Sequence, residues 1–228
     1  MALGGGGFAF GKAETIVDNY ILGLTGQERP SVCFVPTASG DSPDLIVRFY
    51  EAFPPIRASA SHLGLFGVPP ADIRSLLLEQ HVIYVAGGNT ANMLAVWRLH
   101  GVDAILREAW DVGIVLCGWS AGSICWFEGG TTDSFGPELA ALDDGLGFLP
   151  GSHSPHYDVE QERRPTYHRA VRERRLPPGM AAENGVALHY VDRELAEVVT
   201  TREGRRAYRV ELVDDEVRET PLDARVLQ

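Results

Sequence analysis

The sequence predicts an α/β fold, in which a doubly wound and mostly parallel sheet is followed by a C-terminal β meander. Three observations lead to this fold class: short apolar runs typical of buried strands, helical periodicity between these runs, and a change of character after residue 185. Strands that alternate with helices along a chain are typical of βαβ units, whose strands lie parallel.

Three runs have the composition of strands that are covered on both faces: Ser31–Thr37, Val82–Ala86 and Gly113–Gly118. Each carries apolar side chains at both odd and even positions, whereas a strand with one solvent-exposed face would alternate between apolar and polar residues. The pattern therefore favours a parallel sheet with helices on both sides.

Four segments have helical spacing: Lys12–Gly26, Ser42–Phe53, Thr90–His100 and Val102–Trp110. In the third segment Met93, Leu94 and Trp97 share one face, and Gly101 stands where a helix would end. We therefore expect a helix over Thr90–His100 that stops at Gly101.

The C-terminal part of the chain has strand-like segments without helices between them. Val186–Tyr190, Ala196–Thr200 and Arg206–Val213 are consistent with a β meander, and Glu203-Gly204 supplies a turn between the last two. No segment in the middle has the composition of a linker, so residues 1–228 are expected to form one domain.

Charge and composition exclude several classes of function. The 228 residues include 20 Lys and Arg against 31 Asp and Glu, and this net charge of −11 disfavours nucleic acid as a partner. No apolar run reaches the ~18 residues that span a bilayer, so no membrane association is expected. The first residues show neither the basic nor the long apolar region typical of a signal peptide, so none is expected, and the three cysteines show neither CxxC nor zinc spacing. These features predict a cytoplasmic protein.

The glycine-rich loops of the chain indicate where a site would lie. Doubly wound sheets bind ligands beyond the carboxyl ends of their strands, where Gly4–Gly7, Gly87-Gly88-Asn89 and Gly118–Gly122 are expected. Gly4–Gly7 lacks the Lys-Ser/Thr of a nucleotide-binding loop, and the three residues before it are too few for a strand.

Ser120 is the candidate nucleophile. It stands in Gly118-Trp-Ser-Ala-Gly122, a G-x-S-x-G pattern between a predicted buried strand and a predicted helix, where a strained turn exposes the hydroxyl. The N–H of Ala121 could then donate to an oxyanion, and a glycine N–H at Gly88 could be the second donor. The alternative interpretations are an ordinary Gly/Ser turn and, at the second loop, a helix cap made by Asn89 or Thr90.

A nucleophilic serine needs a base, and His156 is favoured among the seven histidines because it lies in a loop directly after a proline. The less favoured alternative is a zinc site formed by His153, His156 and Asp158, but their spacing is not that of a helical pair and no fourth ligand is evident. Two acids could orient the histidine: Asp133, after Thr131-Thr132, and Glu183, in the turn that opens the next strand.

These motifs, taken in order, resemble the peptidase E (aspartyl dipeptidase) family and its relative cyanophycinase. The motifs are Gly4–Phe8, Ala86–Thr90, Gly118–Gly122 and Pro155-His156-Tyr157, and the resemblance extends from Gly4 to about Tyr190. It implies a fold similar to class I glutamine amidotransferases, with serine in place of the cysteine nucleophile. It also implies a cofactor-independent serine peptidase that removes N-terminal aspartate from dipeptides.

Carried over by motif, the resemblance implies Ser120 as nucleophile, His156 as base, and Gly88 and Ala121 as oxyanion donors. The acid is open: Asp133 follows its Thr-Thr pair with one residue fewer than in enteric peptidase E, and Glu183 matches the cyanophycinase glutamate. Glu183 is favoured, and Asp133 would then lie on the substrate side.

Recognition of an aspartyl side chain needs a cation, and residues 160–175 hold six arginines against three glutamates. Most of these arginines are expected on a solvated helix face. Arg163 and Arg164, nearest to His156, are the candidates for the substrate carboxylate, together with Asn89 in the second loop. The expected partner is a small peptide, and the chain is expected as a monomer or homodimer. A cyanophycinase-like hydrolase of β-aspartyl peptides and a non-catalytic binding module are the alternatives.

Overall fold

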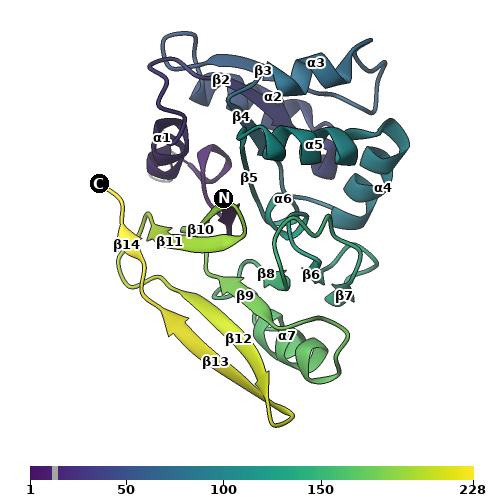
Figure 1. Cartoon of the computed structure of the whole chain (residues 1–228), viewed down its shortest axis with the longest axis vertical. Coiled ribbons are helices and arrows are strands. Elements are labelled where there is room, and N and C mark those ends of the chain that lie inside the picture. The colour runs from purple at the N-terminus through teal and green to yellow at the C-terminus, as the bar shows by residue number, and fades with distance from the viewer. Residues whose placement is uncertain (12–14) are drawn as a thin grey trace.

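Figure 1 shows the computed structural model of the chain, which describes residues 1–11 and 15–228. Within these described residues, fourteen strands form two sheets. The first sheet contains β1 (Ala2–Leu3), β2 (Ser31–Val35), β3 (Ser59–His62), β4 (Val82–Val85), β5 (Val115–Trp119), β10 (Val186–Val191), β11 (Glu194–Thr200) and β14 (Arg225–Val226). The second contains β6 (Gly129–Thr132), β7 (Ala140–Leu142), β8 (Ser152–Ser154), β9 (Gly179–Ala182), β12 (Ala207–Val213) and β13 (Glu216–Leu222).

The helices lie around and between the two sheets (Figure 1). The α-helices are α1 (Thr15–Gly23), α2 (Pro43–Ala52), α3 (Ile73–Leu78), α4 (Thr90–His100), α5 (Val102–Asp111), α6 (Ala121–Ile124) and α7 (Arg163–Arg172), and the short 3₁₀ turns are η1 (Phe8–Phe10) and η3 (Thr37–Ser39). Within the described ranges, no helix is long and apolar enough to cross a bilayer.

The first sheet is doubly wound, as predicted. Its strand order is β14-β11-β10-β1-β5-β4-β2-β3, and the five strands from β1 to β3 in this order are parallel. Since successive side chains of a strand point to opposite faces, Val32 and Phe34 of β2 pack with α1 and α2, while Cys33 and Val35 pack with α3, α4 and α5. This two-sided burial explains why the predicted strands are apolar at both parities.

The predicted helix over Thr90–His100 is confirmed as α4. Asn89 caps it by accepting a hydrogen bond from the Asn92 N–H at 2.8 Å, and Gly101 ends it with a left-handed φ of 70°. The helix expected over Lys12–Gly26 corresponds to α1, and the beginning of that range falls outside the described residues.

The second sheet has the order β13-β12-β9-β8-β6-β7, and α7 packs against it. Tyr167 and Val171 of α7 form an apolar cluster with Ala181 of β9 and Val210 of β12. The short helix α6, which follows β5, contacts strands of both sheets and so lies at their junction.

Two features of the chain ends differ from the sequence-based expectations. The residues before Gly4 do form a strand, because two-residue β1 pairs with β5 on one side and with β10 on the other. The predicted C-terminal strands are present, but they form two hairpins in different sheets, β10 with β11 and β12 with β13, instead of one continuous meander. The formation of β1 and the attachment of the two hairpins to different sheets both depend on strands that are distant in sequence, which local patterns do not specify.

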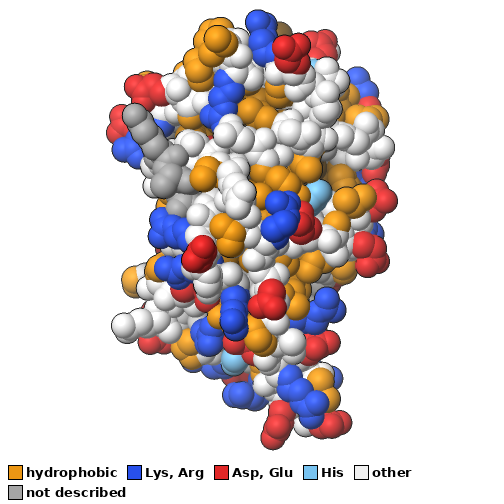
Figure 2. Space-filling model, turned by 90° about the vertical axis from the view of Figure 1, so that its left-hand side faces the viewer, with side chains coloured by type: hydrophobic (Ala, Val, Ile, Leu, Met, Phe, Trp, Pro, Cys, Tyr) orange, Lys and Arg blue, Asp and Glu red, His pale blue; other side chains and the backbone are white. Residues whose placement is uncertain are grey.

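On the face shown in Figure 2, basic and acidic side chains of the described residues are interspersed, without an extended patch of one sign. Cys33, Cys117 and Cys125 are buried free thiols.

Candidate active site

Ser120 stands in a strained turn between β5 and α6. Its φ of 54° and ψ of −116° lie outside the regions that non-glycine residues favour. The flanking glycines permit the turn: a Cβ at Gly118 would lie 2.5 Å from the Gly122 carbonyl oxygen, and one at Gly122 would collide with the Val85 carbonyl. The sequence motif therefore has the strand–turn–helix context that activates a serine.

The end of β1 brings Ser120 and His156 to the same place. The Leu3 carbonyl accepts from the Ser120 N–H at 3.3 Å, and the next carbonyl, Gly4, accepts from the His156 N–H at 2.8 Å. Gly5 must be glycine here, since a Cβ would overlap Asn184 Oδ1 and lie 3.0 Å from His156 Cε1. No hydrogen bond joins the Ser120 hydroxyl to the His156 ring in the part of the chain described, and such bonds often form only once substrate is bound.

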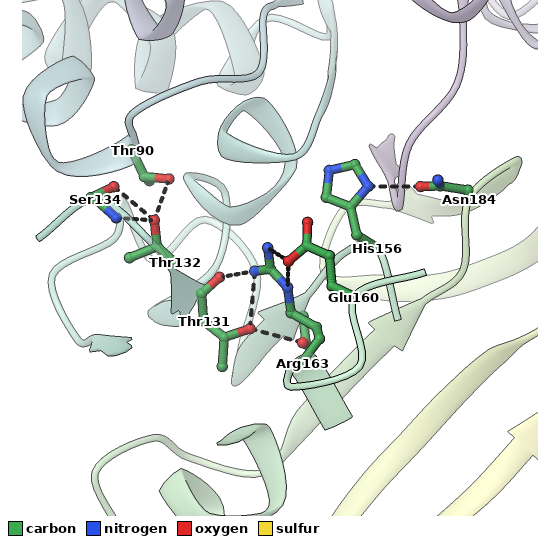
Figure 3. A network of polar contacts seen from close by, with 9 residues as sticks. Thr90, Thr131, Thr132, Ser134, His156, Glu160, Arg163 and Asn184 are labelled. Carbon is green, nitrogen blue, oxygen red and sulfur yellow. Dashed lines mark hydrogen bonds and ion pairs between the residues drawn. The ribbon is translucent and has the colours of Figure 1, made fainter. Parts of the chain in front are cut away.

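The partner of the His156 ring is Asn184, as Figure 3 shows. Nδ1 of His156 lies 2.7 Å from Asn184 Oδ1. With the amide oxygen as acceptor, the ring proton sits on Nδ1 and Nε2 is left unprotonated. An asparagine in this position fixes the tautomer and orientation of the ring without adding a negative charge.

Burial sets the ionisation of His156. Desolvation lowers the pKa of His156 below its usual 6.5, the hydrogen bond to Asn184 opposes this change, and the nearby Arg163 charge adds to it. The histidine is therefore neutral at pH 7 and available to accept a proton.

Glu183, the favoured acid, points away from His156. Its carboxylate accepts from the Tyr208 hydroxyl at 2.7 Å and from the Arg206 N–H at 3.1 Å, both on or next to β12. The structure thus places Glu183 beside the second sheet, and the next residue in the same turn contacts the histidine.

Asp158 holds the turn that carries Asn184. One oxygen accepts from the Asn184 N–H at 2.8 Å, and the other pairs with the guanidinium of Arg205. In the sequence Asp158 stood out only as a possible metal ligand. Its role here depends on a contact across 26 residues of chain, for which the sequence offers no local signal.

Asp133 lies on the loop between β6 and β7 and is exposed. That loop is fastened to the start of α4, because Asn89 Nδ2 donates to the Ser134 carbonyl at 3.0 Å and the Ala91 N–H donates to the Ser134 hydroxyl at 3.2 Å. Asn89 therefore uses both ends of its amide within the protein, for this contact and for the helix cap. The structure does not bring Asp133 into contact with His156.

The two predicted oxyanion donors follow β4 and β5: Gly88 lies in the loop after β4, and Ala121 is the first residue of α6. Gly87 lies close to the candidate nucleophile, since a Cβ there would lie 3.1 Å from Ser120 Cβ. The N–H groups of Gly88 and Ala121 donate to no acceptor among residues 1–11 and 15–228. An oxyanion requires unpaired donors of this kind.

Arg163 is buried close to His156, and all of its nitrogens are paired. One terminal nitrogen donates to the Thr131 carbonyl at 2.6 Å, while Nε and the other terminal nitrogen donate to Glu160 (Figure 3). An acidic substrate would have to compete with Glu160 for this guanidinium.

Arg164 faces another part of the molecule. Its guanidinium lies over the rings of Tyr157 and Tyr208, 4.7 and 4.8 Å from their centroids, and pairs with Glu219 at 3.3 Å. Burial is the largest single influence and lowers the pKa of Arg164, but Glu219, Tyr208 and Tyr157 together outweigh it and the pKa is raised. The side chain fastens α7 to the second sheet.

The zinc alternative finds no support in the geometry. His153 is buried, stacks on Phe127 with ring centroids 4.9 Å apart, and bonds the Met180 carbonyl through Nδ1. Burial lowers the pKa of His153 to about 3. In the described part of the chain, no three His, Cys, Asp or Glu side chains are grouped to hold a metal ion.

Phe10 forms an apolar wall that sequence reasoning did not single out. Its ring centroid is 6.4 Å from those of both Trp119 and His156, and the side chain is 43% exposed. Phe10 therefore lies beside the ring of His156 while remaining partly exposed to solvent.

Comparison with known proteins places this chain in a class of peptidases. The model of peptidase family S51 matches residues 1–198. A Bacillus subtilis protein described as the uncharacterized peptidase YgaJ is 49% identical over 227 residues, covering 100% of this chain and 98% of that protein. Peptidase E of Shewanella denitrificans is 31% identical over 127 residues, 51% of this chain and 53% of the relative.

Solved structures show the same fold. A peptidase from an acI-B1 actinobacterium superposes with a TM-score of 0.67 at 16% identity, covering 98% of this chain and 93% of that one. A putative peptidase E from Listeria monocytogenes gives a TM-score of 0.51 at 18% identity, with 89% and 93% covered. The chain belongs to peptidase family S51, which confirms the resemblance inferred from the motifs.

Proposed function

We propose that this peptidase is a serine-type enzyme that cleaves short peptides after their first residue, with Ser120 as nucleophile and His156 as base. The observation that carries the proposal is the strained Ser120 turn, which adjoins His156 through consecutive carbonyls at the end of β1. Strain at a non-glycine residue persists only where the surroundings enforce it, and it is common at catalytic residues.

The proposed reaction passes through an acyl-enzyme. His156 Nε2 takes the proton of the Ser120 hydroxyl as Oγ attacks the carbonyl carbon of the first residue, and the resulting oxyanion accepts from the Gly88 and Ala121 N–H groups. His156 then protonates the leaving nitrogen and the C–N bond breaks. A water molecule, deprotonated by His156, attacks the ester and restores the serine.

Asn184 is proposed as the residue that orients His156. Its oxygen holds the Nδ1 proton, which leaves the lone pair of Nε2 free to accept a proton. A neutral partner stabilises the imidazolium that forms in the transition state less than a carboxylate does. Burial acts in the same direction, because it lowers the pKa of His156 and favours the neutral ring. Glu183 and Asp158 would act indirectly, by holding the turn that carries Asn184.

Selectivity for N-terminal aspartate stays a prediction. Arg163 and Arg164 are each paired with a carboxylate of the protein, so neither offers an open guanidinium in this structure. Rates of hydrolysis of Asp-Leu, Asn-Leu, Ala-Leu and isoaspartyl-Leu would decide it, because Asp-Leu and Asn-Leu differ only in the charge of the first side chain. A preference for isoaspartyl-Leu would favour the cyanophycinase-like alternative.

Labelling with a fluorophosphonate probe tests the nucleophile directly. We expect intact-mass detection of one adduct on Ser120 in the wild type and none in Ser120→Ala. Hydrolysis of none of the four dipeptides, together with no adduct, would favour a binding module and contradict the proposed activity.

A further inference from the structure

The ion pair of Glu160 and Arg163 has one unused acceptor beside His156. Nε and a terminal nitrogen of Arg163 donate to the same oxygen of Glu160, Oε2, at 2.9 and 2.6 Å. The other oxygen, Oε1, has no hydrogen-bond partner in residues 1–11 and 15–228. In Figure 3 this oxygen points to the side on which the His156 ring lies.

The two side chains differ in exposure. The Arg163 side chain is only 4% exposed and is held from inside by the Thr131 carbonyl, whereas the Glu160 side chain is 42% exposed. The buried guanidinium of Arg163 therefore holds the carboxylate of Glu160 in place. The group that a ligand can reach is this negatively charged carboxylate.

We propose that Oε1 of Glu160 receives the α-ammonium group of the peptide substrate. This inference rests on the proposed peptidase activity at Ser120. The amino terminus of a peptide has a pKa of about 8 and is charged at neutral pH, so its bond to a carboxylate is charge-assisted. An enzyme that holds the amino terminus in place thereby fixes how many residues precede the bond that is cut.

The other carboxylates near His156 are less suited to this role. Glu183 accepts from Tyr208 and Arg206, and Asp158 pairs with Asn184 and Arg205, so both have their oxygens engaged. Glu160 is also close enough for its charge to raise the pKa of His156 against the dominant effect of burial.

The test compares Ala-Leu with propionyl-Leu, the same molecule without the amino group. Glu160→Gln keeps an oxygen for Arg163 but removes the charge. We expect this variant to lower the preference for Ala-Leu over propionyl-Leu in kcat/KM by about tenfold or more, mainly through KM. Glu162→Gln, the same change at an exposed position of the same segment, is the matched control and should leave the preference unaltered.

An unchanged preference in Glu160→Gln would overturn the inference, and so would an equal loss for both substrates, which would indicate only a structural role.

Calorimetric binding of the two ligands to Ser120→Ala, with and without Glu160→Gln, decides the point without turnover. Failure of the wild type to cleave either compound would contradict the proposed function. Loss of the ammonium preference in the double variant would still support the role of Glu160.

Discussion

The turns that carry Ser120 and His156 both hold a non-glycine residue at positive φ, 54° and 55°, but they are built differently. The Ser120 turn is local, because two glycines of one five-residue motif fit against the Val85 carbonyl. The His156 turn depends on Gly4 and Asn184, which are far away in sequence. The proposed nucleophile is thus placed by a motif, and the proposed base by contacts that converge from three parts of the chain.

The largest expected effect is that of Ser120→Ala. Removal of the nucleophile should lower kcat by at least about 10⁴-fold, as in other serine peptidases, while the fold is kept because alanine is smaller than serine. Steady-state hydrolysis of Ala-Leu and circular dichroism would measure the two outcomes. Hydrolysis at the wild-type rate would show that another residue attacks the substrate.

Loss of the long-range contact at His156 should be less severe. We expect Asn184→Ala to lower kcat/KM by about 10²-fold, because the imidazole is no longer held in one tautomer and orientation. Glu183→Gln, the matched change at the neighbouring residue, should have a smaller effect, since its carboxylate bonds Tyr208 and Arg206. The reverse order would identify Glu183 as the orienting acid and contradict the geometry.

The pH dependence of kcat/KM reports the same contact. Because the base must be neutral and burial lowers the pKa of His156, activity should fall with decreasing pH only below 6.5. Asn184→Asp adds a negative charge next to the ring, favours the imidazolium, and should move this acid limb to higher pH by about one unit. An acid limb that stays in place in the variant would mean that another group is titrating.

The smallest effect concerns the strain of the Ser120 turn. Ser120→Gly should be more stable to unfolding than Ser120→Ala by roughly 1 kcal/mol, since only glycine adopts this φ and ψ without strain. Urea unfolding of both inactive variants would measure the difference. Equal stability would indicate that the turn stores no strain.

The elements that could be predicted from the sequence are those that local rules determine. Helix α4 has its cap, its apolar face and its terminal Gly101 within one segment, and the Ser120 motif contains its own glycines. By contrast, Glu183 and Asn184 are neighbours in one turn. Which of them meets His156 is decided by the pairing of Glu183 with Tyr208 on β12, and this partner cannot be identified from the local pattern.

Strand pairing sets the other limit on prediction. The segments of β10, β11 and β12 have recognisable strand patterns, but alternation does not tell which sheet a strand joins. Strand β1 is two residues long and has no periodicity to detect. It exists because β5 and β10 lie on both sides of it.

The position of β1 has a consequence for the order in which the fold can be completed during synthesis. Ala2 pairs with Gly118 and with Leu188, so β1 has both of its neighbours only when the chain as far as β10 has been made. The carbonyls that adjoin both Ser120 and His156 belong to β1 and the residue after it. The backbone around these two residues is therefore completed only when β10 joins the sheet.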